Sequence, residues 1–109
     1  MLPRMPCEVC APSKLCGLHL TDAYENARGY ALGKGAAWAE YVYRHVGRRD
    51  RAKPWPRTKQ MATQARRRLA TEILTIGYRI DDPRLATMLV REYAEGAARR
   101  WAALARRYQ

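Results

Sequence analysis

The chain has 109 residues and a formal net charge of +11, and its aliphatic content is low. Leu, Ile and Val make up only 17 residues and Phe is absent, so a core must draw on the 18 Ala, 7 Tyr and 3 Trp. Few aliphatic residues with high charge also characterise disordered chains, but here the apolar residues recur at helical spacing. Val and Ile are too scarce for a protein built of strands. The sequence predicts a small all-α protein.

Membrane, secreted and enzymatic classes are disfavoured. No apolar run approaches the roughly 18 residues of a membrane-spanning helix, and the first residues lack an apolar stretch of signal-peptide length. We therefore expect a cytoplasmic protein that has no membrane partner. The sequence also contains no evident Ser-His-Asp set, phosphate-binding glycine loop or converging carboxylate pair, so we expect no enzymatic activity.

All three cysteines lie in the first twenty residues and, with one histidine, form the pattern C-x2-C-x5-C-x2-H, namely Cys7, Cys10, Cys16 and His19. Two residues between ligands allow both to reach one ion from a tight turn, and two such pairs fill a tetrahedral site. Thiolate and imidazole favour zinc over magnesium or calcium. We expect residues 1–20 to form a loop around a structural Zn²⁺, because four protein ligands leave no position for water.

Other interpretations of the cysteines explain less. A redox pair of Cys7 and Cys10 leaves Cys16 and His19 without a role, and an iron–sulfur site would need an unusual ligand. The Pro-Cys-x-x-Cys stretch around Cys7 matches half of the zinc-deaminase signature. That chemistry also requires a His-x-Glu earlier in the chain, which is missing.

Residues 21–109 are expected to form the helical domain. Its first helix should begin with Thr21 or Asp22 as N-cap and end before Gly47. Small residues recur in it every four positions, at Ala23, Ala27, Ala31, Gly35 and Ala39. This row allows another helix to approach closely, either within the chain or in a second copy that forms a homo-oligomer.

The same helix contains glycines, which weaken it, and aromatic residues, which can pack in the core. Gly29, Gly33 and Gly35 each weaken a helix by about 1 kcal/mol relative to Ala, which predicts a bend or a break. Aromatic residues at helical spacing, here and later in the chain, are expected to supply much of the core. These residues are Trp38, Tyr41, Tyr93 and Trp101.

Two further helices are predicted after a segment that contains two prolines. The second should run from Thr58 to Tyr78, and the third should have Asp82 as N-cap and Pro83 at its first position. The apolar stripe of the third is Leu85, Leu89, Tyr93, Ala97, Trp101, Leu104 and Tyr108. A connection of only three residues, 79–81, predicts that these two helices form an antiparallel hairpin.

Basic residues concentrate in the loop 47–57 and just beyond it. Arg accounts for 17 of the 21 basic residues, and its planar group pairs bidentately with phosphate. The candidate nucleic-acid-binding residues are Arg48, Arg49, Arg51, Lys53, Trp55, Arg57, Lys59, Arg66 and Arg67. Trp55 either stacks on a base or closes the edge of the core. Near the chain end, Arg99, Arg100, Arg106 and Arg107 are expected to complement the dipole of the last helix, with contact to nucleic acid as the alternative.

These patterns support two functional hypotheses. The first is a small basic zinc protein that binds nucleic acid, DNA ahead of RNA, in a regulatory or phage- or plasmid-type accessory role. The second is a protein-binding adaptor or inhibitor that docks on a larger acidic partner, such as an enzyme of transcription or nucleic-acid processing.

Overall fold

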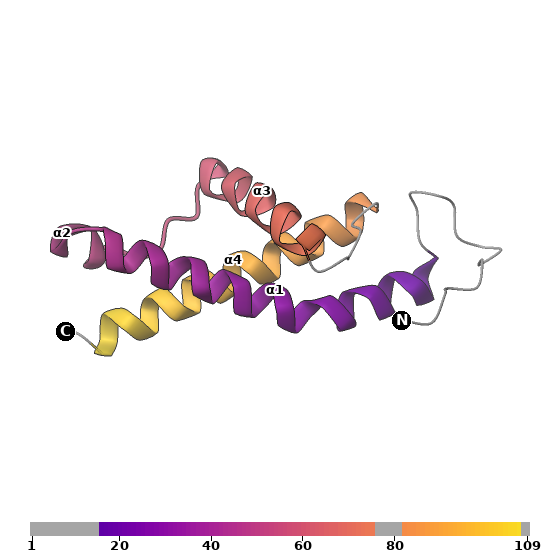
Figure 1. The fold of residues 1–109 in the computed structure, drawn as a ribbon, viewed down its shortest axis with the longest axis horizontal. Helices are drawn as coiled ribbons and strands as arrows, with labels where there is room; N and C mark the ends of the chain where they lie inside the picture. The colour runs from indigo at the N-terminus through magenta and orange to yellow at the C-terminus, as the bar shows by residue number, and fades with distance from the viewer. Residues whose placement is uncertain (1–15, 76–81, 108–109) are drawn as a thin grey trace.

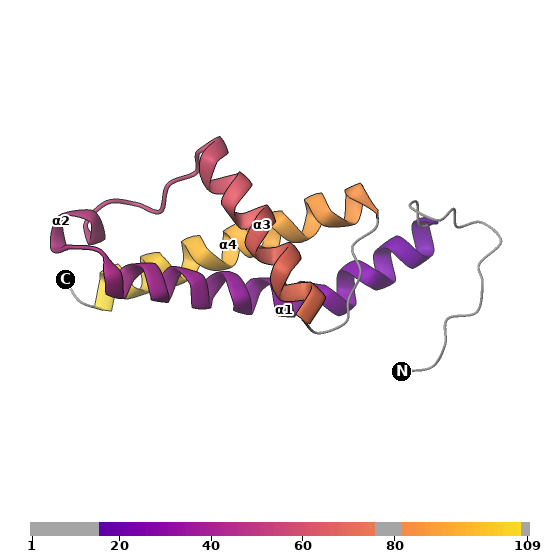
Figure 2. The same ribbon diagram turned by 45° about the horizontal axis from the view of Figure 1, so that its top comes forward.

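The computed structural model describes residues 16–75 and 82–107, and all the regular structure in these ranges is helical. The helices are α1 (Gly17–His45), α2 (Arg48–Arg51), α3 (Lys59–Thr75) and α4 (Pro83–Arg107). The all-α class is therefore confirmed. The radius of gyration is 16.1 Å, against about 12–13 Å for a compact chain of this size. Figures 1 and 2 show this elongated shape, with α1 and α4 along the long axis and α3 packed beside them.

Helix α1 begins five or six residues earlier than predicted. Its N-cap is Cys16, whose Sγ accepts a hydrogen bond from the backbone N–H of His19 at 3.5 Å. Thr21 is inside the helix, where its hydroxyl donates to the carbonyl of Gly17 at 2.9 Å. Residues 17–20 thus belong to a helix and not to a loop. The predicted end is confirmed, because Gly47 lies just beyond the C-cap.

The glycines of α1 do not break it. The helix is assigned without interruption from Gly17 to His45, although Figures 1 and 2 show that its axis bends part-way along. A helix of this length is held by packing along one face more than by the propensity of single residues, and α4 supplies that packing. No helix in the described ranges combines the length and the apolar character that crossing a membrane requires.

Helices α1 and α4 form the main interface of the fold, and they run in the same direction. Arg28 pairs with Glu92 at 3.6 Å, and further along both helices the ring of Tyr43 contacts that of Trp101 at 5.3 Å. Because the contacting residues advance together along both helices, the C-terminal ends of α1 and α4 lie at the same end of the molecule. This parallel pairing of distant helices was not predicted.

The row of small residues in α1 faces α4. A Cβ added at Gly35 would lie 1.9 Å from the carbonyl oxygen of Tyr93, and one at Gly96 would lie 2.2 Å from that of Leu32. Ala31 and Ala39, in the same row, are fully buried. The close approach therefore occurs within the chain. The homo-oligomer hypothesis requires this row to face a second copy, but α4 covers it.

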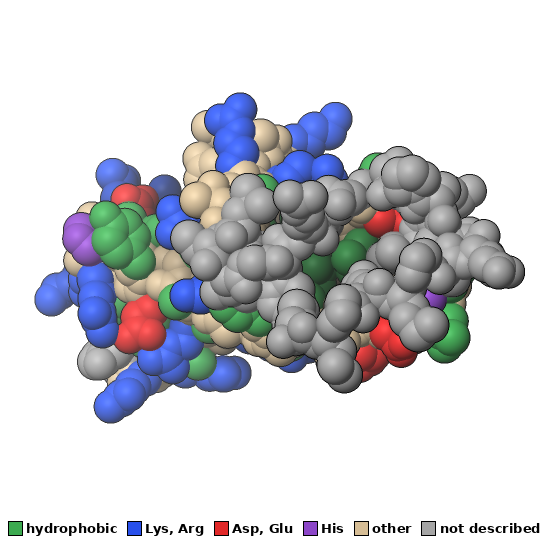
Figure 3. Space-filling model, turned by 45° about the vertical axis from the view of Figure 1, so that its right-hand side comes forward, with side chains coloured by type: hydrophobic (Ala, Val, Ile, Leu, Met, Phe, Trp, Pro, Cys, Tyr) green, Lys and Arg blue, Asp and Glu red, His purple; other side chains and the backbone are tan. Residues whose placement is uncertain are grey.

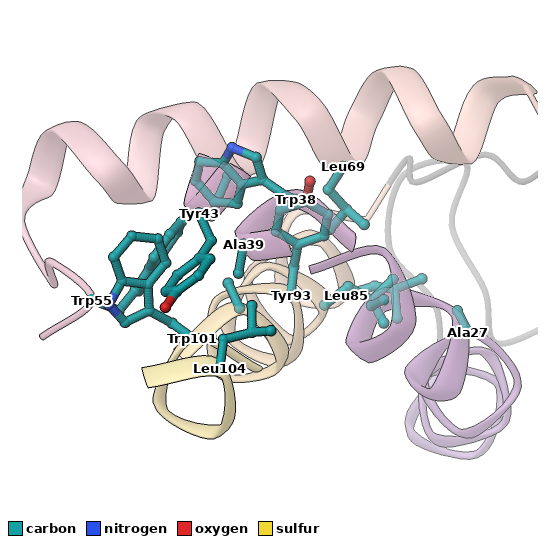
Figure 4. Close-up of a cluster of buried hydrophobic side chains, with 14 residues drawn as sticks. Ala27, Trp38, Ala39, Tyr43, Trp55, Leu69, Leu85, Tyr93, Trp101 and Leu104 are labelled. Atoms are coloured by element: carbon teal, nitrogen blue, oxygen red, sulfur yellow. The ribbon is translucent and has the colours of Figure 1, made fainter. Parts of the chain in front are cut away.

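Rings from three segments form a buried aromatic cluster (Figure 4). Trp38 of α1 lies 5.0 Å from Trp55 and 5.5 Å from Tyr93, and Trp55 lies 5.3 Å from Trp101. The indole N–H of Trp101 donates to the carbonyl of Lys53 at 2.8 Å. These contacts attach the proline-containing segment that follows α2 to the α1–α4 pair.

Helix α3 begins after Thr58, as predicted, with the Thr58 hydroxyl accepting from the N–H of Met61 at 3.2 Å. Helix α3 runs opposite to α4 (Figure 1), as the predicted hairpin requires. The main packing partner of α4 is α1, however, and the prediction did not include that interface. The Nε of Arg68 donates to the hydroxyl of Tyr93 at 3.2 Å, and burial raises the pKa of Tyr93 to about 12. Residues 76–81, where the second helix was predicted to end, lie outside the described residues.

The start of α4 matches the sequence prediction and can be tested. Asp82 is 2% exposed, and its Oδ1 accepts from the backbone N–H of Arg84 at 2.9 Å. Asp82→Ala is expected to lower the free energy of unfolding by about 1–2 kcal/mol, because it leaves that N–H without its cap. Urea unfolding measures the change, and Asp82→Asn should retain most of the stability. Equal stability of Asp82→Ala and wild type would contradict the capping role.

Candidate nucleic-acid interface

Three helical segments bring arginines to one end of the molecule. The C-terminal parts of α1 and α4 meet there because the helices are parallel, and α2 follows α1 directly (Figure 1). We call this region the arginine-rich end, and it comprises Arg44, Arg48, Arg49, Arg51, Arg100, Arg106 and Arg107. Figure 3 shows Lys and Arg side chains gathered over it. Two helix C-termini carry partial negative charge, which favours guanidinium groups nearby.

A pocket of about 410 Å³ opens between these segments. We call it the arginine pocket, and its lining residues are Glu40, Tyr43, Arg44, Arg51, Arg100, Leu104 and Arg107. Four guanidinium groups against one carboxylate leave the lining with a formal charge of +3. An anion that enters is met by planar donors, each able to form two parallel hydrogen bonds with a phosphate.

The only carboxylate of the lining is shared. Glu40 accepts from Arg44 at 2.8 Å and from Arg100 at 3.4 Å. Arg51 is oriented differently, because its Nε donates to the carbonyl of Tyr43 at 2.8 Å and its guanidinium lies 4.7 Å from the centre of that ring. A carboxylate shared by two arginines neutralises only one charge, and the contacts with Tyr43 orient Arg51. The pocket therefore has an oriented guanidinium and is still cationic.

The predicted residues of the 47–57 segment divide into two groups. Arg48 and Arg49 are exposed on α2, and within the described ranges neither makes an ion pair. Lys53 and Arg57 are also exposed, but Lys53 pairs with Asp50 at 3.5 Å and Arg57 pairs with Glu95 at 3.6 Å. Solvent-exposed pairs are weak, so these two cations can exchange a carboxylate for a phosphate.

The predicted cations of α3 form a separate surface. Lys59, Arg66 and Arg67 are exposed, and no ion pair is found for them among the described residues. Figures 1 and 2 show α3 apart from α2, so the structure does not bring these three residues into the arginine-rich end. Their neighbour Arg68 is also exposed, but its guanidinium packs on the fold, 5.3 Å from the centre of the Trp38 ring.

Trp55, the predicted base-stacking residue, is part of the core. It is 8% exposed and packs between Trp38 and Trp101 (Figure 4). The two prolines on either side keep the backbone extended, which allows the ring to fold onto the α1–α4 pair. Of its two interpretations, closing the edge of the core is the one observed, and stacking on a base is not available in this conformation.

Two of the four predicted zinc ligands lie in the described ranges. Cys16 and His19 are three residues apart at the start of α1, so both side chains lie on one face of its first turn. The Sγ of Cys16 is 3.2 Å from the Nδ1 of His19. A sulfur and a nitrogen bound to one tetrahedral zinc ion would be about 3.5 Å apart. The observed contact is a hydrogen bond somewhat shorter than that separation, and Cys7 and Cys10 lie outside the described residues.

The residues missed by sequence reasoning are those that need the tertiary fold. Arg44, Arg100 and Arg107 belong to two helices that are distant in the chain, and the last two were assigned to the dipole of the final helix. Tyr41 was predicted to be in the core but is 58% exposed. The sequence signal for these arginines was that the last turns of α1 and α4 are both basic. That signal does not show that the two turns lie side by side.

Comparison with known proteins adds no family assignment: no protein-family model, no curated protein and no solved structure matches the chain.

Proposed function

We propose that this protein binds nucleic acid through its arginine-rich end, with the arginine pocket holding backbone phosphate. The supporting observation is the pocket itself, whose lining holds four arginines and one carboxylate, which Arg44 and Arg100 share. Arg48 and Arg49 extend the cationic surface beyond it. DNA is the expected ligand ahead of RNA, and a regulatory or phage- or plasmid-type accessory role fits a small protein of this charge.

The salt dependence of DNA binding tests this proposal. Each phosphate contact releases counterions, so affinity should fall steeply between about 50 and 200 mM salt. Arg48→Glu with Arg49→Glu should weaken binding by at least about tenfold and reduce the slope of log affinity against log salt by about 2. Fluorescence anisotropy of a labelled oligonucleotide measures both quantities. A flat salt response in the wild type would contradict the proposal.

Arg91→Glu is the matched control for charge. Arg91 is exposed on α4, about 24 Å along the helix from Arg107, and its reversal changes the net charge by the same amount per site. It should weaken binding much less than either change in α2. If Arg91→Glu lowers DNA affinity as much as the changes in α2, binding depends on net charge and not on the arginine-rich end.

The alternative function, a protein-binding adaptor or inhibitor, predicts a different pattern. The same two changes in α2 would then disrupt one protein complex, and DNA affinity would be too weak to depend on them. A pull-down from lysate with and without nuclease distinguishes the two functions. Nuclease-resistant capture of one stoichiometric protein supports the adaptor, and loss of capture on nuclease treatment supports nucleic-acid binding.

We also propose that Cys7, Cys10, Cys16 and His19 hold a structural zinc ion. The support is the spacing in the sequence together with the position of Cys16 at the N-terminus of α1. That position puts Cys16 and His19, three residues apart, on one face of the first turn. The ion would attach residues 1–15 to the helical domain and would take no part in a reaction.

A further inference from the structure

Tyr41 is the one large aromatic side chain that the described part of the fold leaves mostly open to solvent. It is 58% exposed, whereas Trp38 and Tyr43 of the same helix are buried. Its position in α1 explains this difference, because successive residues of a helix are rotated by about 100°. Tyr41 therefore points away from α4, which covers the face of Trp38 and Tyr43.

The ring of Tyr41 is held in place by His45. The two rings are stacked, with centroids 4.2 Å apart and an angle of 29° between their planes. The Nδ1–H of His45 donates to the carbonyl oxygen of Tyr41 at 2.8 Å, since a carbonyl can only accept. This bond fixes the imidazole one turn along the helix, so the two rings form an ordered aromatic layer on the surface.

This aromatic layer lies beside the arginine-rich end. Arg44 follows Tyr41 by three residues, so the two side chains are neighbours on the surface of α1, and Arg44 lines the arginine pocket. Arg48 and Arg49 open α2, two residues after the end of α1. An exposed ring next to a cationic pocket is the combination that binds single strands, in which phosphates meet the cations and bases stack on aromatics.

We infer that the ligand of the arginine-rich end is a single-stranded nucleic acid, with a backbone phosphate in the arginine pocket and an unpaired base stacked on Tyr41. This inference rests on the proposed function and adds the strandedness of the ligand. In a duplex both faces of each base are covered by its neighbours, so Tyr41 has no base to contact there. A single strand presents a free face, and stacking on it does not depend on the base sequence.

Binding of the full-length protein to two probes tests the inference. The probes are a labelled thymidine oligonucleotide of about 12 nucleotides and a duplex of the same length, both followed by anisotropy. The wild type should bind the single strand more tightly. Tyr41→Ala should weaken single-strand binding by at least about fivefold and leave duplex binding within twofold, about the error of the method. Tyr41→Phe keeps the ring and should bind as the wild type does.

Leu18→Ala is the matched control. Leu18 is the other large exposed hydrophobic residue, 71% exposed, and it lies at the opposite end of α1. This variant should bind both probes as the wild type does. If Tyr41→Ala leaves single-strand affinity unchanged, or lowers both affinities equally, the stacking inference is overturned while phosphate binding stands. If the wild type binds neither probe, the proposed function fails and this inference fails with it.

Discussion

Gly35→Ala is expected to destabilise the fold by about 3 kcal/mol or more. The added methyl carbon would lie 1.9 Å from the carbonyl oxygen of Tyr93 and 2.8 Å from the carbonyl carbon. Both atoms belong to the backbone of α4, so no side chain can rotate away, and the two helices would have to separate. Separation would also loosen the packing of the aromatic cluster. Urea or thermal unfolding followed by circular dichroism measures the loss.

Gly33→Ala provides the matched control within the same helix. Nothing lies within 4 Å of a Cβ at Gly33, so the substitution only replaces a poor helix former by a good one. It should stabilise the protein by up to about 1 kcal/mol. The two changes are identical in chemistry and two residues apart, and their effects should have opposite signs. Destabilisation by both, or by neither, would show that the helices do not cross at Gly35.

The crossing also determines where the arginines lie. Close contact at Gly35 and Gly96 sets the angle and register of α1 against α4, and this register places Arg44 next to Arg100 through Glu40. A variant that separates the helices should therefore lose the arginine pocket as well. Gly35→Ala is expected to weaken DNA binding under conditions where it is still folded, although the residue contacts no ligand.

Helix α4 was the most predictable element because local signals agree along its whole length. Asp82 and Pro83 mark its start, and its apolar stripe from Leu85 to Leu104 recurs with a helical period. The structure buries that stripe. In α1 the signals conflicted, because the glycines suggested a break while the row of small residues suggested close packing. The packing decides the outcome, since α4 covers the row.

The candidate interface was only partly predictable. Arg48 and Arg49 could be selected because they belong to one local run of charge. The pocket formed with Arg44 and Arg100 could not, because it depends on the parallel pairing of two helices whose contacting residues, such as Glu40 and Arg100, are 60 positions apart in the chain. Tyr41 was expected in the core and is exposed, and for Trp55 the sequence left a buried and a base-stacking position open. The reason is the same for both: which aromatic residue is buried depends on which face α4 and the proline segment cover.

Zinc removal is expected to affect one end of the molecule and to leave the other intact. Purified full-length protein, treated with reductant, should contain one zinc ion per chain by elemental analysis. Cys16→Ser and His19→Asn should each lose the ion to a chelator concentration that the wild type withstands, because each removes a ligand of a four-ligand site. Thr21→Ala, which alters only a helical hydroxyl bonded to Gly17, should retain zinc.

The location of the structural effect follows from the packing of α1. Its first turns are about half exposed. They are attached to the rest of the fold by Leu20, Ala23 and Tyr24, which pack against the core, and by the hydrogen bond from Tyr24 to Glu92. Without the ion, Cys16 and His19 would lose their link to Cys7 and Cys10. The first turns of α1 should then fray, with a small loss of helical signal in circular dichroism. The aromatic cluster lies far along the helix, so tryptophan fluorescence should stay unchanged. Metal-free wild type with full helical content would contradict the zinc site.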